Sequence, residues 1–146
     1  MSGASAFRRE AGTDGVLVVT LDVPGEKVNT LGKSLIGEFE GLLDDVEKDA
    51  SVRALVVRSG KPDSFIAGAD IKDFTRIGSA EEGEALSRAG HAIFDRLEGC
   101  RVPVVAAIHG TCLGGGTELA LACRYRVASD DPKTSIGLPE VMLGLV

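Results

Sequence analysis

Large aromatic side chains and positive charge are both scarce in this sequence of 146 residues. It has no tryptophan and one tyrosine, so broad platforms for stacking nucleobases are not expected. Its 16 lysines and arginines face 22 acidic residues, which gives a net charge of −6. This balance argues against general affinity for nucleic acid or anionic membranes, although a local basic group can still meet a small anionic ligand.

Cysteines and long apolar runs are few as well. The three cysteines, Cys100, Cys112 and Cys123, are odd in number and lack metal-ligand spacing, so we expect buried reduced thiols and no metal site. The N-terminus has no apolar signal core, and no apolar run is long enough to span a bilayer. These absences predict a cytoplasmic protein, or one of another reducing compartment, that does not contact membranes.

Glycine, in contrast, is abundant, with 19 residues, and hydrophobic residues make up 44% of the chain. A chain of this length and composition can bury a core as one domain. The small and polar residues at 1–14 predict a flexible N-terminus, followed by one core domain over 15–146. Short apolar strands alternate with helices in that domain, which favours an α/β fold with mostly parallel strands.

Hydrophobic periodicity places the elements along the chain. It predicts strands at 16–23, 52–60, 102–110 and 125–128, helices at 29–49 and 79–100, and a loop at 61–74 centred on Gly68. Asn29 or Thr30 is expected to cap the first helix. Ser79 and Glu82 are expected to form a capping box at the second helix.

The stretch GTCLGGGTE, at 110–118, approaches a nucleotide-binding loop without satisfying either pattern. Gly116 stands where a phosphate loop needs its lysine, and Leu119 stands where the dinucleotide fingerprint needs its third glycine. The first amides of a helix lack partners and carry partial positive charge. Gly115 and Gly116 can therefore offer N–H groups to a phosphate, a carboxylate or the enolate of a thioester.

Glu118 follows in the first turn of the expected helix, and two interpretations of it stay open. A carboxylate at this position would repel a phosphate, but it suits a neutral carbonyl group that becomes an oxyanion. Alternatively, Glu118 only complements the helix dipole, and the glycines only allow close packing.

A second candidate segment is FIAGADIKDF, at 65–74. Gly68 permits a sharp bend that can aim the amide of Ala69 into a cleft as a second donor to an oxyanion. Lys72 can meet a phosphate there, or it can be an ordinary solvated lysine of a surface loop.

A third candidate segment is SIGLPEVMLGLV, at 135–146, in which Pro139 fixes the backbone just before Glu140. Four apolar residues flank the acid: Leu138, Val141, Met142 and Leu143. A carboxyl group partly withdrawn from water can exchange a proton near neutral pH. The alternative is a glutamate at the start of a helix that faces water.

The chain resembles the crotonase, or enoyl-CoA hydratase/isomerase, superfamily over about 16–146, through IAGADIK, GTCLGGGTELALAC and GLPEVMLGL in this order and spacing. The stretches VPGEKVNTL, KPDSFIAGADI and DDPKTSIGLPEVMLGL are most similar to the hydratase end of the multienzyme α-subunit of fatty-acid oxidation. The resemblance implies a spiral of ββα units. It also implies a homo-oligomer, trimeric or hexameric, or membership of a fatty-acid oxidation complex. Because family members usually continue beyond this point, we expect a fold that is incomplete at the C-terminus.

The resemblance further implies roles for individual residues. The oxyanion donors fall on the amides of Ala69 and Gly115, and the two catalytic glutamates fall on Glu118 and Glu140. The residues implied in CoA binding are Ala67 through its main chain, Lys72 near the phosphates and, more weakly, Lys27.

The implied activity is syn hydration of trans-2-enoyl-CoA to 3-hydroxyacyl-CoA in fatty-acid β-oxidation, with a side activity as a Δ3-Δ2 enoyl-CoA isomerase. Glu118 would act as base on the water that attacks C3, and Glu140 would place the proton on C2. CoA arrives as part of the substrate, and no metal or redox cofactor is required. Two alternatives stay open: a non-catalytic fragment or assembly subunit with this fold, and another CoA-thioester enzyme of the family.

Overall fold

Two mainly parallel sheets form the frame of the protein in a computed structural model, which describes residues 5–144 apart from the side chains of Phe74 and Leu143. The larger sheet contains β1 (Phe7–Ala11), β2 (Val16–Leu21), β3 (Ala54–Ser59), β5 (Val104–Ile108) and β7 (Tyr125–Ala128). These strands are neighbours in that order; β1 is antiparallel to β2, and the other pairs are parallel. The smaller sheet is parallel throughout and contains β4 (Ser64–Ile66), β6 (Thr111–Leu113) and β8 (Ser135–Gly137).

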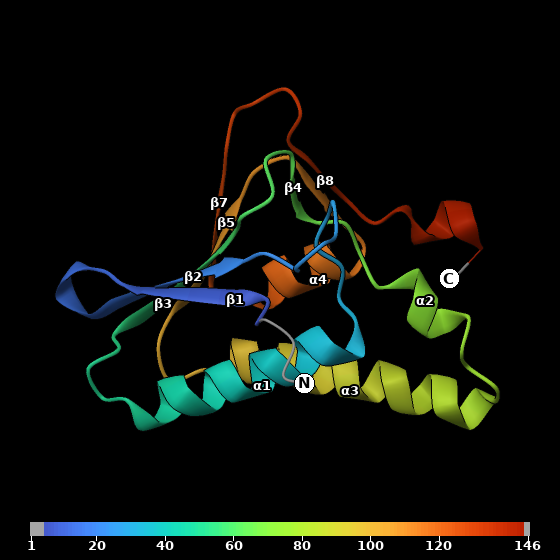
Figure 1. The fold of residues 1–146 in the computed structure, drawn as a ribbon, viewed down its shortest axis with the longest axis horizontal. Coiled ribbons are helices and arrows are strands. Elements are labelled where there is room, and N and C mark those ends of the chain that lie inside the picture. The colour runs from blue at the N-terminus through green and yellow to red at the C-terminus, as the bar shows by residue number, and fades with distance from the viewer. Residues whose placement is uncertain (1–4, 145–146) are drawn as a thin grey trace.

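The chain winds between the two sheets in repeating units (Figure 1). The helices are α1 (Lys33–Lys48), α2 (Ile71–Phe74), α3 (Ala80–Glu98) and α4 (Gly115–Ala122), and the 3-10 turns are η1 (Thr13–Gly15) and η2 (Pro139–Leu143). Three times, a strand of the larger sheet is followed by a strand of the smaller sheet and then by a helical segment. These units, β3-β4-α3, β5-β6-α4 and β7-β8-η2, are the ββα spiral that the motifs predicted.

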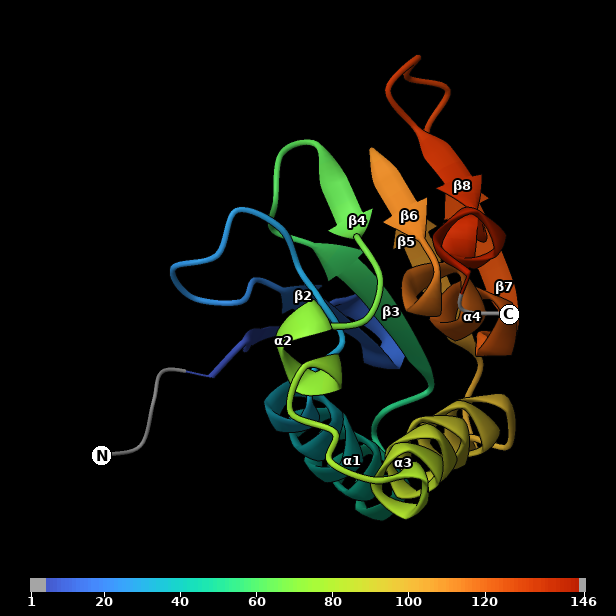
Figure 2. The same ribbon diagram turned by 90° about the vertical axis from the view of Figure 1, so that its right-hand side faces the viewer.

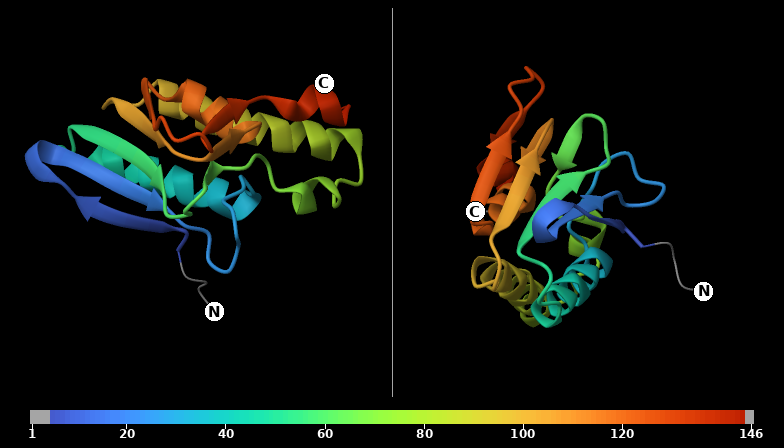
Figure 3. Two further views of the ribbon diagram at one scale, coloured as in Figure 1. Left: turned by 90° about the horizontal axis from the view of Figure 1, so that it is seen from above. Right: turned by 90° about the vertical axis from the view of Figure 1, so that its left-hand side faces the viewer.

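Helices α1 and α3 lie side by side under the larger sheet (Figures 2 and 3). The buried face of α1 follows the helical period: Leu35, Phe39, Leu42, Leu43 and Val46. The buried residues of α3, Ile93 and Leu97, both belong to its C-terminal half. The N-terminal half of α3 is thus less tightly covered. A pocket opens between the two helices along α3 from Gly83 to Phe94.

The N-terminal segment differs from the sequence-based expectation. Residues 7–11, expected to be flexible, form β1 at the edge of the larger sheet. The ring of Phe7 packs edge-on against Phe39 of α1, with ring centroids 4.7 Å apart, and this contact ties β1 to the core. A single buried aromatic among polar neighbours produced no periodicity that predicts a strand. Positions 1–4 and 145–146 lie outside the described residues.

The start of α1 also differs from the prediction. Its N-cap is Gly32, so neither Asn29 nor Thr30 caps this helix. Asn29 is fully buried instead and bonds to three strands. Ser79 caps α3 as predicted, because its hydroxyl accepts the Glu82 amide at 3.2 Å. The Glu82 carboxylate accepts a loop amide rather than the Ser79 amide, so the expected box is not closed.

The stretch 61–74 contains two elements rather than a simple loop. Ser64–Ile66 form β4, and Ile71–Phe74 form α2. Asp70 caps α2 by accepting the amide of Lys72 at 2.9 Å. A strand of three residues is too short to show an alternating pattern, so its only signal is the pairing with β6, far away in the sequence.

Two of the three thiols are buried as expected. Cys112 and Cys123 are buried and Cys100 is half-buried, and none of the three forms a disulfide. Burial raises the pKa of the Cys112 thiol, and it raises the pKa of Cys123 to about 12. Among residues 5–144, no group of three or more His, Cys, Asp or Glu side chains is arranged to hold a metal ion. No helix in this described range is long and apolar enough to cross a membrane.

Candidate active site

The glycine stretch forms a tight turn between β6 and α4, at a place where another backbone passes very close. Gly114 adopts φ 53° and ψ −124°, a conformation that disfavours residues with a side chain. A Cβ atom on Gly116 would lie 2.5 Å from the carbonyl oxygen of Ile66 in β4. Gly116 is therefore required for packing between two ββα units, which supports the packing interpretation for this one glycine.

Gly115 brings the start of α4 next to the segment that follows β4. A Cβ atom on Gly115 would lie 3.7 Å from the backbone nitrogen of Ala69. Within the described residues, neither the Ala69 N–H nor the Gly115 N–H donates to an acceptor, whereas the next amide, of Asp70, donates to the Leu31 carbonyl at 3.1 Å. The two amides that the sequence suggested as oxyanion donors thus lie together, and both can be used by a ligand.

Glu118, in the first turn of α4, is close to this pair of amides. Its Oε2 lies 3.7 Å from the position that a Cβ atom on Gly115 would take. The side chain is exposed, and it lines a pocket together with Ala69 and Gly115. A carboxylate so placed can act on a molecule whose carbonyl oxygen is held by the two amides.

Glu140 reaches the same turn from η2. Its Oε1 occupies the space that a Cβ atom on Gly114 would need, and the Cα of Gly68 lies 3.7 Å from that position. Its Oε2 is buried and has no hydrogen-bond partner among the described residues. Since buried polar atoms are nearly always paired, this oxygen marks a place for a polar ligand. One oxygen of Glu140 is thus withdrawn from water, while the residue as a whole is half-buried.

The burial of Glu140 has a different cause from the expected one. The flanking residues Leu138, Val141 and Met142 are 55%, 71% and 85% exposed, so they do not cover the carboxylate. The side chain of Leu143 lies outside the described part of the chain. The glycine turn covers Glu140 instead, and this contact between two ββα units is invisible in the local sequence.

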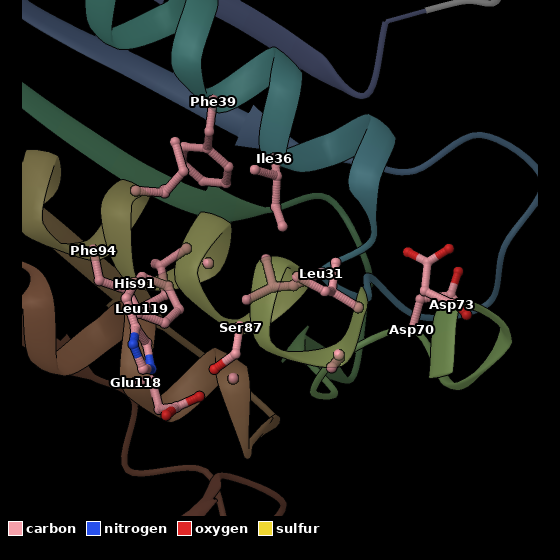
Figure 4. Close-up of a pocket in the computed structure, with 16 residues that line it drawn as sticks. Leu31, Ile36, Phe39, Asp70, Asp73, Ser87, His91, Phe94, Glu118 and Leu119 are labelled. Carbon is pink, nitrogen blue, oxygen red and sulfur yellow. The ribbon is translucent and has the colours of Figure 1, made fainter. Parts of the chain in front are cut away.

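A pocket of about 220 Å³ extends from the turn into the space between α1 and α3 (Figure 4). Its apolar lining includes Ile36, Phe39, Leu86, Ile93, Phe94 and Leu119. Gly90 of α3 also lines it, and a Cβ atom added there would meet nothing within 4 Å. The arrangement suits a ligand with an apolar chain and a polar head held at the glycine turn.

Four polar residues of the pocket were not singled out from the sequence. Ser87 and His91 line it from α3, and Asp70 and Asp73 lie at the end away from Glu118 (Figure 4). One oxygen of Asp73 is already engaged in a hydrogen bond, because its Oδ2 accepts a backbone amide at the start of α1 at 3.0 Å. Ser87 and His91 are one turn apart on α3, a spacing from which a shared face could have been predicted.

The three residues suggested for CoA binding do not line this pocket. Lys72 is exposed on α2, and its Nζ lies 3.2 Å from the Glu26 carboxylate. Lys27 is exposed in the same loop as Glu26. The Ala67 N–H donates to the carbonyl of Asn29 at 2.9 Å, so its own carbonyl is the group left for a ligand.

Comparison with known proteins decides the family. The model of the family described as enoyl-CoA hydratase/isomerase matches residues 11–146. The chain belongs to this family. The fatty acid oxidation complex subunit alpha of Idiomarina loihiensis is 54% identical over 146 residues, which cover 100% of this chain and 21% of that protein. The subunit of the same name from Shewanella oneidensis is 53% identical over 139 residues, or 95% of this chain and 19% of that protein. This family member therefore spans about a fifth of the length of these relatives.

Solved structures of the family share the fold. The enoyl-CoA hydratase from Bacillus anthracis matches with a TM-score of 0.88 and 29% identity, over 97% of this chain and 54% of that structure. An enoyl-CoA hydratase/isomerase from Xanthobacter autotrophicus matches with a TM-score of 0.85 and 32% identity, over 96% of this chain and 51% of that structure. The crotonase fold expected from the motifs is confirmed over about half the length of these proteins.

Proposed function

We propose that this chain forms the catalytic core of an enoyl-CoA hydratase that adds water, in a syn manner, to trans-2-enoyl-CoA and yields 3-hydroxyacyl-CoA. One observation carries the proposal. Two amides with no acceptor in the described part of the chain, of Ala69 and Gly115, meet two carboxylates, of Glu118 and Glu140, at one glycine turn. Membership of the hydratase/isomerase family supports it.

The two amides would act on the thioester carbonyl. Hydrogen bonds from Ala69 and Gly115 polarise the C=O bond and draw electron density away from C3, which makes C3 open to attack. As the enolate develops, its oxygen gains negative charge, and these fixed donors stabilise the charge without reorganising. A donor of this kind contributes about 3–4 kcal/mol to the transition state.

The two glutamates would handle the protons. Glu118, at the edge of the pocket, takes a proton from the water molecule whose oxygen bonds to C3. Glu140, whose buried Oε2 has no partner among the described residues, enters the step carrying a proton and delivers it to C2 as the enolate collapses. Glu118 then holds the proton taken from water and Glu140 is left as the carboxylate, and proton exchange with solvent restores both acids. Both acids lie at one turn, so the hydroxyl and the hydrogen arrive on the same face of the double bond.

The rest of the substrate follows from this placement. The apolar pocket between α1 and α3 would take the acyl chain. CoA would lie outside it, with the main chain of Ala67 near the adenine, Lys72 near the phosphates and Lys27 as a weaker contact. Lys72 has to exchange its exposed partner Glu26 for a phosphate, and such an exposed ion pair is worth less than about 1 kcal/mol.

The same enolate and one proton shuttle would also move a double bond from C3 to C2, so a side activity as a Δ3-Δ2 isomerase is part of the proposal. The relatives named for a fatty acid oxidation complex support a role in fatty-acid β-oxidation. They also support a place in such a complex. A homo-oligomer of three or six copies and a location in the cytoplasm are proposed from the family resemblance of the motifs alone.

The direct test is incubation of the protein that carries this chain with crotonyl-CoA, while the absorbance of the conjugated thioester is followed. We expect the absorbance to fall and 3-hydroxybutyryl-CoA to form. Binding without turnover would favour a non-catalytic subunit, and turnover of a different CoA thioester would favour another enzyme of the family.

The CoA contacts need a separate test. Lys72→Met should raise KM for the thioester about threefold to tenfold and leave kcat unchanged, because one phosphate contact is lost far from the reacting carbons. Lys48→Met, on the exposed last turn of α1, is the matched control. An unchanged KM for Lys72→Met would remove this lysine from the CoA site.

A further inference from the structure

The mechanism does not use the polar side chain of Asn29, which is fully buried. Its Oδ1 accepts the Val23 amide at 3.0 Å. Its Nδ2 donates to the carbonyls of Leu21 and Phe65, both at 3.1 Å, and to the Ser59 hydroxyl at 2.9 Å. The acceptors on one side and the amide donor on the other fix the orientation of this side chain.

These bonds join elements that are remote in sequence. Leu21 ends β2, Ser59 ends β3, and Phe65 lies in β4, so one carboxamide links both sheets. Buried hydrogen bonds of this kind are costly to break, because each lost partner leaves a desolvated polar group behind. The backbone of Asn29 is held firmly in place as a result.

The backbone next to Asn29 then runs alongside the segment that contains Ala69. The Ala67 amide donates to the Asn29 carbonyl at 2.9 Å, the Leu31 amide to the Gly68 carbonyl at 2.8 Å, and the Asp70 amide to the Leu31 carbonyl at 3.1 Å. These three bonds alternate between the two segments. The amide of Ala69 falls between them and is left without an acceptor among the described residues.

We propose that Asn29 is a positioning residue for the oxyanion donor Ala69. It does not touch the substrate. Through the bonds to β2, β3 and β4, it holds the 29–31 backbone, which in turn fixes the direction of the Ala69 N–H at the pocket. The inference rests on the proposed function, because it assigns Ala69 to the thioester oxygen.

Geometry explains why such a residue matters to rate and not only to stability. A displacement of about 1 Å at a catalytic group can cost about a hundredfold in rate. Across residues 5–144, no acceptor holds the direction of the Ala69 amide by itself. Its aim depends on the bonds on either side, and these depend on the fixed backbone at Asn29.

The first test needs no substrate. Asn29→Asp keeps the Oδ1 acceptor for Val23 and replaces the Nδ2 donor by an oxygen that faces the carbonyls of Leu21 and Phe65. Amide hydrogen exchange measured by NMR should show Ala67 and Asp70 losing protection at least tenfold, with the helical amides of α1 unchanged. Protection of both amides at the level of the unsubstituted protein would overturn the proposal.

The second test uses a conjugated enoyl thioester. In Asn29→Asp, kcat should fall about tenfold to a hundredfold with KM within about twofold, since the donor is lost in the transition state. The C=O stretching band of the bound thioester should shift to lower frequency in the unsubstituted protein and should return toward its position in water in Asn29→Asp. A higher KM with normal kcat and a normal band shift would assign Asn29 to stability alone.

Two controls separate the possible failures. Val46→Ala truncates a buried side chain near the C-terminal end of α1, outside the pocket. It should lower the stability of the fold, as Asn29→Asp does, but leave kcat and the band shift unchanged. Ser59→Ala removes one acceptor of Asn29 and should give the same changes in milder form, about threefold in kcat.

If Asn29→Asp does not fold, unchanged exchange and kcat in Ser59→Ala overturn the inference. Should the unsubstituted protein fail to hydrate any thioester, the proposed function fails, and the exchange test still decides the role of Asn29.

Discussion

The two carboxylates at the glycine turn come from unlike regions of the molecule. Glu118 is exposed in the first turn of α4, beside a helix N-terminus that favours negative charge. Glu140 sits in a short 3-10 turn with one oxygen against Gly114 and the other buried without a partner. One acid is placed by its own helix, and the other is placed by contact with a different unit.

This difference suggests how one site can divide two proton transfers. An exposed carboxylate at the rim of the pocket exchanges protons with water easily, as the base of the proposed hydration must. A carboxyl group with one oxygen buried at the glycine turn can meet a bound molecule on that side, which suits delivery of one proton to carbon. The following experiments break or sharpen this contrast, in order of decreasing effect.

The largest effect is expected when either acid is replaced by its amide, which cannot take part in the proton transfer. Glu118→Gln and Glu140→Gln should each lower kcat for crotonyl-CoA by about 10²–10⁴, because each removes one proton-transfer group and keeps its shape. Binding of the CoA thioester, measured by calorimetry, should stay unchanged. Near-full activity in both variants with binding intact would rule out the mechanism with two acids.

A smaller loss is expected when Glu140 is displaced and not replaced. Gly114→Ala places a methyl group where the Glu140 carboxylate lies, so the acid must move, and kcat should fall about tenfold to a hundredfold. Gly25→Ala is the matched control, because Gly25 has a positive φ of 75° with nothing within 4 Å of an added Cβ atom. If both variants show the same kinetics, backbone strain explains the effect and contact with Glu140 does not.

The apolar lining of the pocket beside Glu118 can be altered without changing either glutamate. Gly90→Leu fills open space in the lining and also improves helix propensity by about 1 kcal/mol, so unfolding would not explain a loss. We expect KM for long-chain enoyl thioesters to rise about tenfold while crotonyl-CoA is turned over normally. Gly41→Leu, a helix glycine with equally open space outside this pocket, should change neither. Equal effects on short and long substrates would remove the acyl chain from this pocket.

The smallest effect concerns the buried thiol of Cys123, which takes no part in the proposed reaction. Its pKa is raised from 9.0 to about 12 by burial, so only the unfolded chain loses this proton as the pH rises above about 9. Stability should therefore be insensitive to this thiol below pH 8 and should fall above pH 9, by up to about 1.4 kcal/mol per pH unit. Urea unfolding between pH 7 and 10 measures the slope, and Cys123→Ala should have a shallower one. Identical slopes would mean that the thiol ionises in the folded state as well.

Sequence patterns located the residues of the candidate site better than they located its supports. The turn at Gly114–Gly116 and the bend at Gly68 have short-range signatures, since glycine is required where backbones meet or turn sharply. The long helices were also predictable from their apolar period, within a few residues at each end. Family motifs then suggested which amides and acids belong together.

Several of the missed features depend on contacts that are remote in sequence. The strand β4 is recognisable only from its partner β6, and β1 only from the contact of Phe7 with Phe39. Asn29 looked like a helix cap because asparagine is common there, whereas its buried carboxamide serves three strands. The cover over Glu140 comes from a turn that precedes it by one complete unit.

The parallel pairing of the smaller sheet has a consequence for the order of folding. Ser64 pairs with Thr111, and Thr111 pairs with Ser135, so each strand must wait for a partner that lies far along the chain. Contacts between distant residues form slowly, because the intervening loop has to close first. The amide of Ala69 and the carboxylates of Glu118 and Glu140 lie in three successive units, and they meet only when this sheet is complete. Catalytic competence should therefore be acquired late in folding, after helices α1 and α3 have formed.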